Sequence, residues 1–335
     1  MTTYLQLAEK ALHDQPLTAA ESRAVLNAPD DDLLALLHAA FVVRSKYFGR
    51  TVRLQMLQNA KSGACQEDCH YCSQSSVSTA PIERYNLLPR SRMIEGARLA
   101  SASKAQRYCI VISGRSPLDR EIEEIAEAVR SIKQEIPIQI CCSLGLLSEA
   151  QAKRLKEAGV DRVNHNLNTS EAYHPSICTT HTFQDRLATI RNARAAGLEI
   201  CSGGIVGMGE TVRDRARMLQ TLASLPQHPE SVPINQLVQV AGTPLAGSAP
   251  LDPFDFVRAI AVARILMPRA HVRLSAGRSD MSDELQALCF LAGANSIFYG
   301  DRLLTTGNPD WEHDRRLFER LGLRPAESNA REATT

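Results

Sequence analysis

From residue 52 onward, short apolar runs with strand character alternate with amphipathic stretches rich in Glu, Lys, Arg and Ala. This alternation predicts a parallel sheet, because each helix carries the chain back to begin another strand in the same direction. Eight such units close a TIM-type barrel of typically about 250 residues. The predicted fold class is therefore α/β, a (β/α)8 barrel. A doubly wound open sheet is the alternative, although no G-x-G-x-x-G motif follows the first strand.

The expected strands lie near residues 52–58, 107–113, 137–142, 160–165, 198–206, 232–239, 271–275 and 294–298. The expected helices include residues 93–104, 120–134, 148–158, 184–196, 211–223, 255–266 and 281–291. We expect residues 1–45 to form an N-terminal helical extension, residues 46–320 the barrel, and residues 321–335 a flexible C-terminal tail. Within the extension, Thr18 and Glu21 form a capping-box pattern that predicts the start of a helix.

Charge and hydropathy exclude several classes of partner. The chain has 38 basic and 37 acidic side chains and a net charge of +1, so no strong field attracts nucleic acid or an anionic membrane. It contains no apolar run of about 18 residues, and its first residues lack the pattern of a signal peptide. We therefore expect a soluble cytoplasmic protein. In a reducing compartment, nine cysteines indicate metal binding or catalysis in preference to disulfides.

Three of these cysteines share a short loop after the first expected strand. Cys65, Cys69 and Cys72 have C-x3-C-x2-C spacing. Thiolates are soft ligands that suit iron–sulfur clusters or zinc. Three protein ligands on a four-iron cluster leave one iron open to bind and activate a substrate. A closed zinc site, with His70 as the fourth ligand, is the alternative.

Three further cysteines lie within expected strands. Cys109, Cys141 and Cys201 fall on the second, third and fifth strands, and Arg273 falls on the seventh. Inward side chains of different strands meet in layers inside a barrel, so these four side chains can converge. Taken alone, each cysteine is better explained by simple packing, because free cysteine is among the most buried residue types. An arginine is almost never buried without a partner, and an anionic metal cluster would be such a partner.

Polar and small residues follow two other strands. Asn164, Asn166 and Asn168 end the fourth strand, and alternation places them on one face. Three amides in register can bind a urea-like or ribose-like ligand, while turn capping is the alternative. Gly203 and Gly204 follow the fifth strand, where they allow close approach of a ligand or form a tight turn.

The cysteine loop also carries a family resemblance. It reads Gly63-Ala64-Cys65-x-Glu67-Asp68-Cys69-x-Tyr71-Cys72-x-Gln74. This string resembles the radical S-adenosylmethionine enzymes, and among them it is similar to the biotin synthases. The resemblance extends from about residue 40 to about residue 325, nearly the whole chain.

The resemblance implies two iron–sulfur clusters. A [4Fe-4S] cluster would be held by Cys65, Cys69 and Cys72 and would bind S-adenosylmethionine. A [2Fe-2S] cluster deep in the barrel would be held by three cysteines and one arginine, and would donate sulfur. The residues that match this inner site are Cys109, Cys141, Cys201 and Arg273. By strand alternation the neighbouring Cys142 should point the other way.

The resemblance also implies the reaction. Reductive cleavage of S-adenosylmethionine would give methionine and a 5′-deoxyadenosyl radical, and sulfur would then be inserted at two carbons of dethiobiotin to give biotin. The implied partners are a flavodoxin-like electron donor, the iron–sulfur assembly machinery and a second copy of the chain in a homodimer. The alternatives are a radical enzyme with another small substrate, and a non-enzymatic zinc or electron-carrier protein.

Further contacts follow from the same resemblance. The residues implied to contact S-adenosylmethionine are Tyr71, Asn166, Asn168, His181, Gly203 and Gly204. Those implied to contact the substrate are Asn164, Asn166 and Asn235. Two positions depart from the common pattern, since many relatives have Asp in place of Asn168 and some have Arg in place of His181. Cys178 and Cys289 match no ligand position and are assigned to packing.

Overall fold

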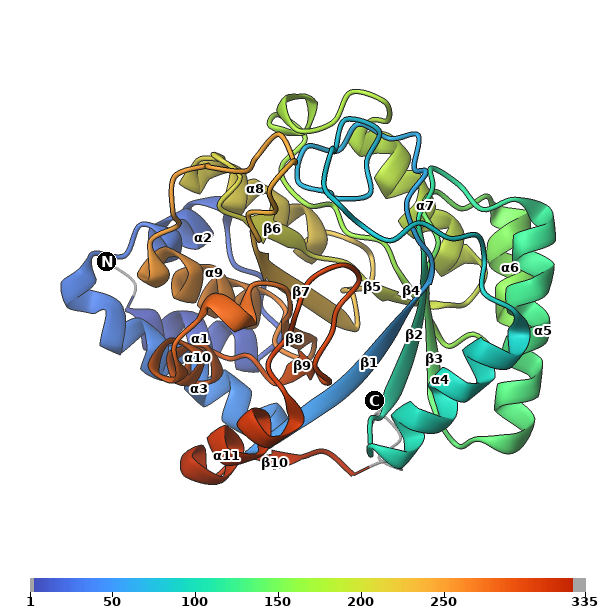
Figure 1. The fold of residues 1–335 in the computed structure, drawn as a ribbon. Coiled ribbons are helices and arrows are strands. Elements are labelled where there is room, and N and C mark those ends of the chain that lie inside the picture. Colours follow the sequence, from blue (N-terminus) through green and yellow to red (C-terminus); the bar gives the residue numbers. More distant parts are fainter. Residues whose placement is uncertain (1–2, 328–335) are drawn as a thin grey trace.

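The computed structural model describes residues 3–327, which form a closed parallel barrel surrounded by helices (Figure 1). The strands are β1 (Thr51–Lys61), β2 (Arg107–Ile112), β3 (Gln139–Ser143), β4 (Arg162–Asn164), β5 (Glu199–Cys201), β6 (Gly204–Val206), β7 (Ser231–Gln236), β8 (His271–Leu274), β9 (Ser296–Phe298) and β10 (Arg324–Pro325). The helices are α1 (Tyr4–Leu12), α2 (Ala19–Leu26), α3 (Leu33–Phe48), α4 (Arg90–Ala102), α5 (Asp119–Glu135), α6 (Glu149–Glu157), α7 (Phe183–Ala195), α8 (Val212–Ala223), α9 (Pro253–Leu266), α10 (Asp283–Leu291) and α11 (Trp311–Leu321). Short 3-10 turns are η1 (Asp30–Asp32), η2 (His174–Ser176) and η3 (Arg278–Asp280).

Pairing of the first barrel strand with the last closes the sheet. The order is β1-β2-β3-β4-β5-β7-β8-β9, all pairs are parallel, and β1 also pairs with β9. The predicted (β/α)8 barrel is therefore confirmed, and the open doubly wound sheet is excluded. The expected fifth strand is divided into β5 and β6, because the chain leaves the ladder at Ser202 and Gly203 before β6 pairs with β7.

Helices cover the outside of the barrel. Figure 1 shows α4, α5, α6 and α7 flanking β1 to β4, while the N-terminal helices lie on the opposite side. There α3 packs against α9, and α2 packs against α8 and α9. The predicted helix start at Thr18 is confirmed, since its hydroxyl accepts from Glu21 N while the Glu21 carboxylate accepts from Thr18 N.

The C-terminal part adds one helix that the expected helices did not include. Helix α11 begins after Asp310, whose side chain accepts a hydrogen bond from His313 N, and ends at Gly322 in the left-handed conformation. Beyond it, Arg324 and Pro325 pair with the start of β1. Most of the expected flexible tail, residues 328–335, lies outside the described residues. Within residues 3–327, no helix is both long enough and apolar enough to cross a bilayer.

Strand register places the cysteines of β2 and β3 side by side. Cys109 pairs with Cys141 across the ladder, and both belong to a small apolar cluster inside the barrel. Cys142 instead joins the main core between the strands and the helices. The alternation expected for Cys141 and Cys142 is therefore confirmed, and one residue of register decides which thiol faces the barrel interior.

Gly203 allows the barrel wall to close at the break between β5 and β6. A Cβ atom at this position would lie 1.9 Å from the carbonyl oxygen of Pro233 in β7. That oxygen belongs to the backbone of a central strand, so it has little freedom to move. A side chain at residue 203 must therefore push β7 away from the break.

We expect Gly203→Ala to lower the free energy of unfolding by about 1–3 kcal/mol, the usual cost of overpacking a well-packed region. Urea unfolding of the metal-free chain measures this loss. Gly307→Ala is the matched control, because a Cβ atom at exposed Gly307 meets no atom within 4 Å. Equal stability of the two variants would contradict this explanation.

Candidate active site

The cysteine loop leaves β1 in a conformation fixed by short polar contacts. Gly63 has a φ of +71°, and a Cβ atom there would lie 2.6 Å from the Arg84 side chain. The Gly63 carbonyl accepts from Ser113 Oγ at 2.6 Å, and its amide donates to Gln74 Oε1 at 2.9 Å. The Gly63 and Gln74 positions of the loop string therefore set the backbone path that presents the cysteines.

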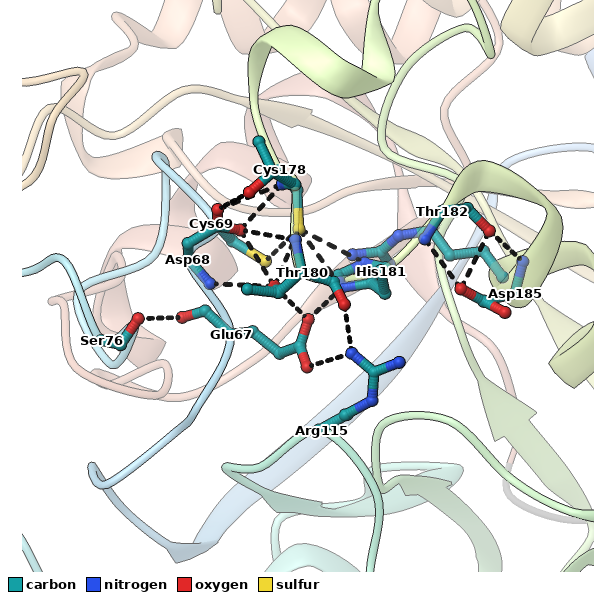
Figure 2. A network of polar contacts seen from close by, with 12 residues as sticks. Glu67, Asp68, Cys69, Ser76, Arg115, Cys178, Thr180, His181, Thr182 and Asp185 are labelled. Carbon is teal, nitrogen blue, oxygen red and sulfur yellow. Dashed lines mark hydrogen bonds and ion pairs between the residues drawn. The ribbon is translucent and has the colours of Figure 1, made fainter.

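Two carboxylates join this loop to the segment that precedes α7 (Figure 2). Asp68 accepts from the backbone amides of Thr179 and Thr180 at 2.9 and 3.2 Å. Although burial opposes its ionisation, the hydrogen bonds from Thr179 hold the pKa of Asp68 well below its ordinary value. Glu67 accepts from Thr180 Oγ1 at 2.6 Å and from Arg115 at 3.0 Å. Three loops, after β1, β2 and β4, thus meet at Glu67.

His181 and Cys178 lie at the centre of this network. The His181 ring contacts the Glu67 carboxylate through Nδ1, and the Cys178 thiol lies 3.7 Å from the Cys69 thiol. All four side chains are buried. The hydrogen bond from Cys69, together with the one from His181, lowers the pKa of Cys178. Sequence reasoning assigned Cys178 to packing, whereas its thiol lies directly beside an expected cluster ligand.

The second cysteine group lies inside the barrel. Arg273 donates to the Cys201 thiol at 3.1 Å and to Gln55 Oε1 at 2.7 Å. Its guanidinium stacks 4.2 Å above the centre of the Phe298 ring. The Cys109 and Cys141 thiols are hydrogen-bonded, and this contact, followed by nearby arginines including Arg273, lowers the pKa of Cys141. The strands thus bring together the four side chains that were expected to converge.

A cavity of about 390 Å³ connects the two groups. Its walls include thiols of both groups and polar groups from several strand ends. The lining residues that the sequence singled out are Cys65, Cys69, Cys72, Tyr71, Cys109, Asn164, Asn166, Asn168, His181, Asn235 and Arg273. The three asparagines therefore face one space, as expected, but strand alternation is not the reason, because β4 ends at Asn164 and His165 lines the same cavity.

Several of these polar side chains also form hydrogen bonds with the backbone of the barrel wall. Asn166 Oδ1 accepts from Gly203 N at 3.2 Å, and Asn235 Nδ2 donates to the Gly204 carbonyl at 2.9 Å. The side-chain amide of Asn168 donates a hydrogen bond to the Tyr71 hydroxyl. The backbone of Asn168 has a φ of +69°. Gly203 and Gly204 are therefore buried in the wall beneath the asparagines.

Sequence reasoning missed Arg186. It donates to the Tyr71 hydroxyl at 3.2 Å and to the Asn166 carbonyl at 2.8 Å, and it lines the cavity. Although burial opposes its charge, nearby Tyr71 and Cys69 raise its pKa. The available signal was its place on α7, three residues after buried Phe183 and four before buried Ile190, where an apolar residue is expected.

Two stretches match known families: residues 60–222 match the Radical SAM superfamily, and residues 233–324 match the Biotin and Thiamin Synthesis associated domain. A biotin synthase from Thioalkalivibrio sulfidiphilus is 55% identical over 303 residues, covering 90% of this chain and 88% of that protein. A biotin synthase from Methylococcus capsulatus is 52% identical over 324 residues, covering 97% and 98%. The crystal structure of a methylornithine synthase has a TM-score of 0.82 at 22% identity, covering 96% and 98% of the two chains, which shows the shared fold.

A closed parallel barrel with three cysteines on the loop after β1, matched to that superfamily, defines a radical S-adenosylmethionine enzyme. Membership implies iron–sulfur clusters and S-adenosylmethionine as cofactors. At more than half identity over nearly its full length, the chain belongs to the biotin synthase family.

We expect Asp68→Asn to weaken the attachment of the cysteine loop. The pKa of Asp68 is lower in the folded state than in the unfolded state. The Asp68 carboxylate therefore stabilises the fold above the unfolded-state pKa of about 3.9, and this stabilisation is lost as the pH falls toward the folded-state pKa. At pH 7 the variant should lose about 1 kcal/mol after allowance for solvent screening. Urea unfolding between pH 7 and pH 3 should show the difference shrinking below about pH 4. Asp31→Asn, at an exposed position of η1, is the control and should show no such pattern.

Proposed function

We propose that this enzyme converts dethiobiotin to biotin, with a [2Fe-2S] cluster inside the barrel as the sulfur donor. One observation carries the proposal: a single cavity is lined both by the three loop cysteines and by Cys109 and Arg273. A radical generated at one wall can therefore act on a substrate that also reaches a sulfur source at the other. An enzyme that only removes hydrogen has no need for the second group.

The interior residues fit an anionic cluster. Cys109, Cys141 and Cys201 are soft donors with side chains at most 1% exposed. Arg273 is equally buried, and its Nε atom has no hydrogen-bond partner among the described residues. A buried cation that retains a free donor supports the presence of a negatively charged group beside it.

The loop residues fit the first cluster. Among residues 3–327, the thiols of Cys65, Cys69 and Cys72 do not form a set with all three sulfurs within 4.8 Å of one another. A cluster distributes its ligands over different irons, so its thiolates lie farther apart than thiolates on one ion. Their position in the stretch that matches the Radical SAM superfamily supports Cys65, Cys69 and Cys72 as ligands of a [4Fe-4S] cluster in preference to the closed zinc site with His70.

When bound, the two clusters and S-adenosylmethionine supply the radical and the sulfur. The protein's own contribution is to bind, orient and shield the substrate. Asn164 and its neighbours offer donors and acceptors that match the ureido ring of dethiobiotin, while Val111 and Leu304 offer apolar wall. Thr305 contacts Ser73 at 2.7 Å, which fastens the loop after β9 to the cysteine loop and restricts water.

The remaining contacts and partners belong to the same proposal. Tyr71, Asn166, Asn168 and His181 would bind S-adenosylmethionine near the loop, with Gly203 and Gly204 shaping the wall behind them. Electrons and replacement sulfide must come from outside the chain. We therefore include a flavodoxin-like donor and the iron–sulfur assembly machinery as partners, and a homodimer as the assembly.

The direct test is anaerobic. After reconstitution with iron and sulfide, the enzyme receives S-adenosylmethionine, a low-potential reductant and dethiobiotin, and mass spectrometry follows 5′-deoxyadenosine and biotin. We expect both products. Deoxyadenosine without biotin would overturn the substrate assignment and favour another small substrate for the same barrel.

Single cysteine variants separate the two sites. We expect Cys72→Ala to lose both products. Cys201→Ala should keep forming 5′-deoxyadenosine, while biotin formation falls by about 100-fold or more. The loss should be this large because even substitutions around a metal's ligands cost 10–100-fold. Iron and sulfide analysis should show loss of a different cluster in each. The control is Cys289→Ala, a buried cysteine on α10, which should keep both clusters and both products. Full biotin formation by Cys201→Ala would remove the inner cluster from the proposal.

A further inference from the structure

Two hydrogen bonds flank the contact between Cys69 and Cys178, one on each side. On one side, the His70 amide donates to the Ile177 carbonyl at 3.0 Å. On the other side, the Thr179 amide donates at 2.9 Å to the carboxylate that precedes Cys69. Figure 2 shows the two thiols pointing toward one another from the cysteine loop and the segment before α7. The two backbones are therefore fastened together on both sides of this cysteine pair.

This arrangement has the geometry that a disulfide requires. The residue after one cysteine is bonded to the residue before the other, which is the pattern of two antiparallel segments. Directly opposed residues of such segments have Cα atoms about 4.5–5.5 Å apart, within the range of about 4.4–6.8 Å that a disulfide spans. The two sulfurs already lie 3.7 Å apart. Rotation of the side chains is therefore sufficient to close the bond, and the backbone need not move.

A small oxidant has a route to this cysteine pair. Both thiols are free in the structure, and their side chains are buried. Cys69 lines the cavity of about 390 Å³, which is large enough to admit hydrogen peroxide. Cys178 is 1% exposed and contacts the Cys69 sulfur from the neighbouring segment. An oxidation that begins at the cavity wall therefore has a second thiol within reach.

We propose that Cys69 and Cys178 form a site of reversible oxidation, which a peroxide converts to a disulfide in the cluster-free enzyme. Hydrogen peroxide oxidises one thiol to a sulfenic acid and releases one water. The second sulfur then attacks the sulfenic sulfur, so that an S–S bond forms, the S–O bond breaks and a second water leaves. Two electrons pass from the two thiols to the peroxide.

The disulfide has a consequence for cluster loading. On the proposed function, Cys69 is a ligand of the [4Fe-4S] cluster, and a sulfur in a disulfide has no thiolate to offer to iron. The disulfide and a fully ligated cluster are then mutually exclusive. The disulfide also holds Cys69 at an oxidation step that thiols reverse, before the irreversible sulfinic acid. This consequence rests on the proposed function, whereas formation of the disulfide does not.

The test uses the full chain, stripped of iron and sulfide by a chelator, reduced, and freed of reductant without oxygen. One equivalent of hydrogen peroxide is added, the remaining thiols are blocked with a maleimide, and tryptic peptides are mapped by mass spectrometry. Trypsin releases Cys178 in residues 163–186, which contain no other cysteine, and the three loop cysteines in residues 62–84. We expect these two peptides to be joined. Maleimide on Cys178 in the oxidised chain would overturn the proposal.

Variants identify the loop cysteine without any assay of catalysis. Cys65→Ala and Cys72→Ala should each keep the two peptides joined, whereas Cys69→Ala should leave Cys178 free to react with the maleimide. Cys289→Ala, a buried cysteine on α10, is the matched control and should behave as the unmodified chain does. Joined peptides that survive Cys69→Ala but are lost in Cys65→Ala or Cys72→Ala would contradict the assignment.

Oxidation of the unfolded chain tests whether the fold directs this pairing. Cys69 and Cys178 are 109 positions apart, and closing so long a loop costs more entropy than pairing two neighbouring loop cysteines. In concentrated urea the joined fraction should therefore fall by about tenfold or more. An equal yield of joined peptides in urea would show that the contact in the folded chain is not the cause.

A final comparison separates this inference from the proposed function. The oxidised chain is reconstituted with stoichiometric iron and sulfide before and after treatment with dithiothreitol, and Mössbauer spectroscopy distinguishes the two cluster types. Peptide mapping of the same samples shows whether the disulfide is still present. We expect a [4Fe-4S] cluster only after dithiothreitol. A disulfide that leaves loading of this cluster unhindered would keep the oxidation site and contradict the assignment of Cys69 to the cluster. Absence of the disulfide would contradict the site, whatever the loading.

Discussion

The closed register of the barrel is the constraint on which both cysteine groups depend. Because β1 pairs with β2 on one side and β9 on the other, no strand can slip by one residue without turning its inward side chains into the outer core. Cys141 and Cys142, which are neighbours in β3, show this dependence on register. The first faces Cys109 inside the barrel, while the second packs beneath the helices. The inner thiols are therefore placed by backbone pairing, independent of any metal.

Charge compensation explains why such an interior tolerates so many arginines. Arg107 and Arg162 are fully buried near the start of the barrel strands, and both reach Glu199. Together with Arg273 they create a positive environment around Cys141. Thiolates and an anionic group are stabilised by that environment, whereas the same arginines beside neutral packing residues would be costly. The electrostatics of the barrel interior and the proposed inner cluster thus support one another.

Local patterns were sufficient for the fold and for part of the site. The periodicity of apolar residues located every barrel strand. Burial of one or both faces of a strand or helix determines where apolar residues recur along the chain. Asn164, Asn166 and Asn168 line one cavity as expected, although only Asn164 belongs to β4, so the turn after the strand places the other two. The contact between Cys69 and Cys178 joins residues 109 positions apart, and no periodicity encodes such a pair. Arg186 lies where the helix pattern of α7 predicts an apolar residue, and this mismatch was the one local signal of its role.

The segment before α7 follows the fourth strand and is bonded to the cysteine loop through Asp68 and Glu67. His181 borders the cavity that we assign to S-adenosylmethionine, yet its Nδ1 atom is already engaged by Glu67. An imidazole held in this way offers its other ring nitrogen to a ligand, where an arginine would offer a charged fork. Through their contacts with Glu67 and Cys69, His181 and Cys178 hold the segment before α7 against the cysteine loop at the edge of the cavity.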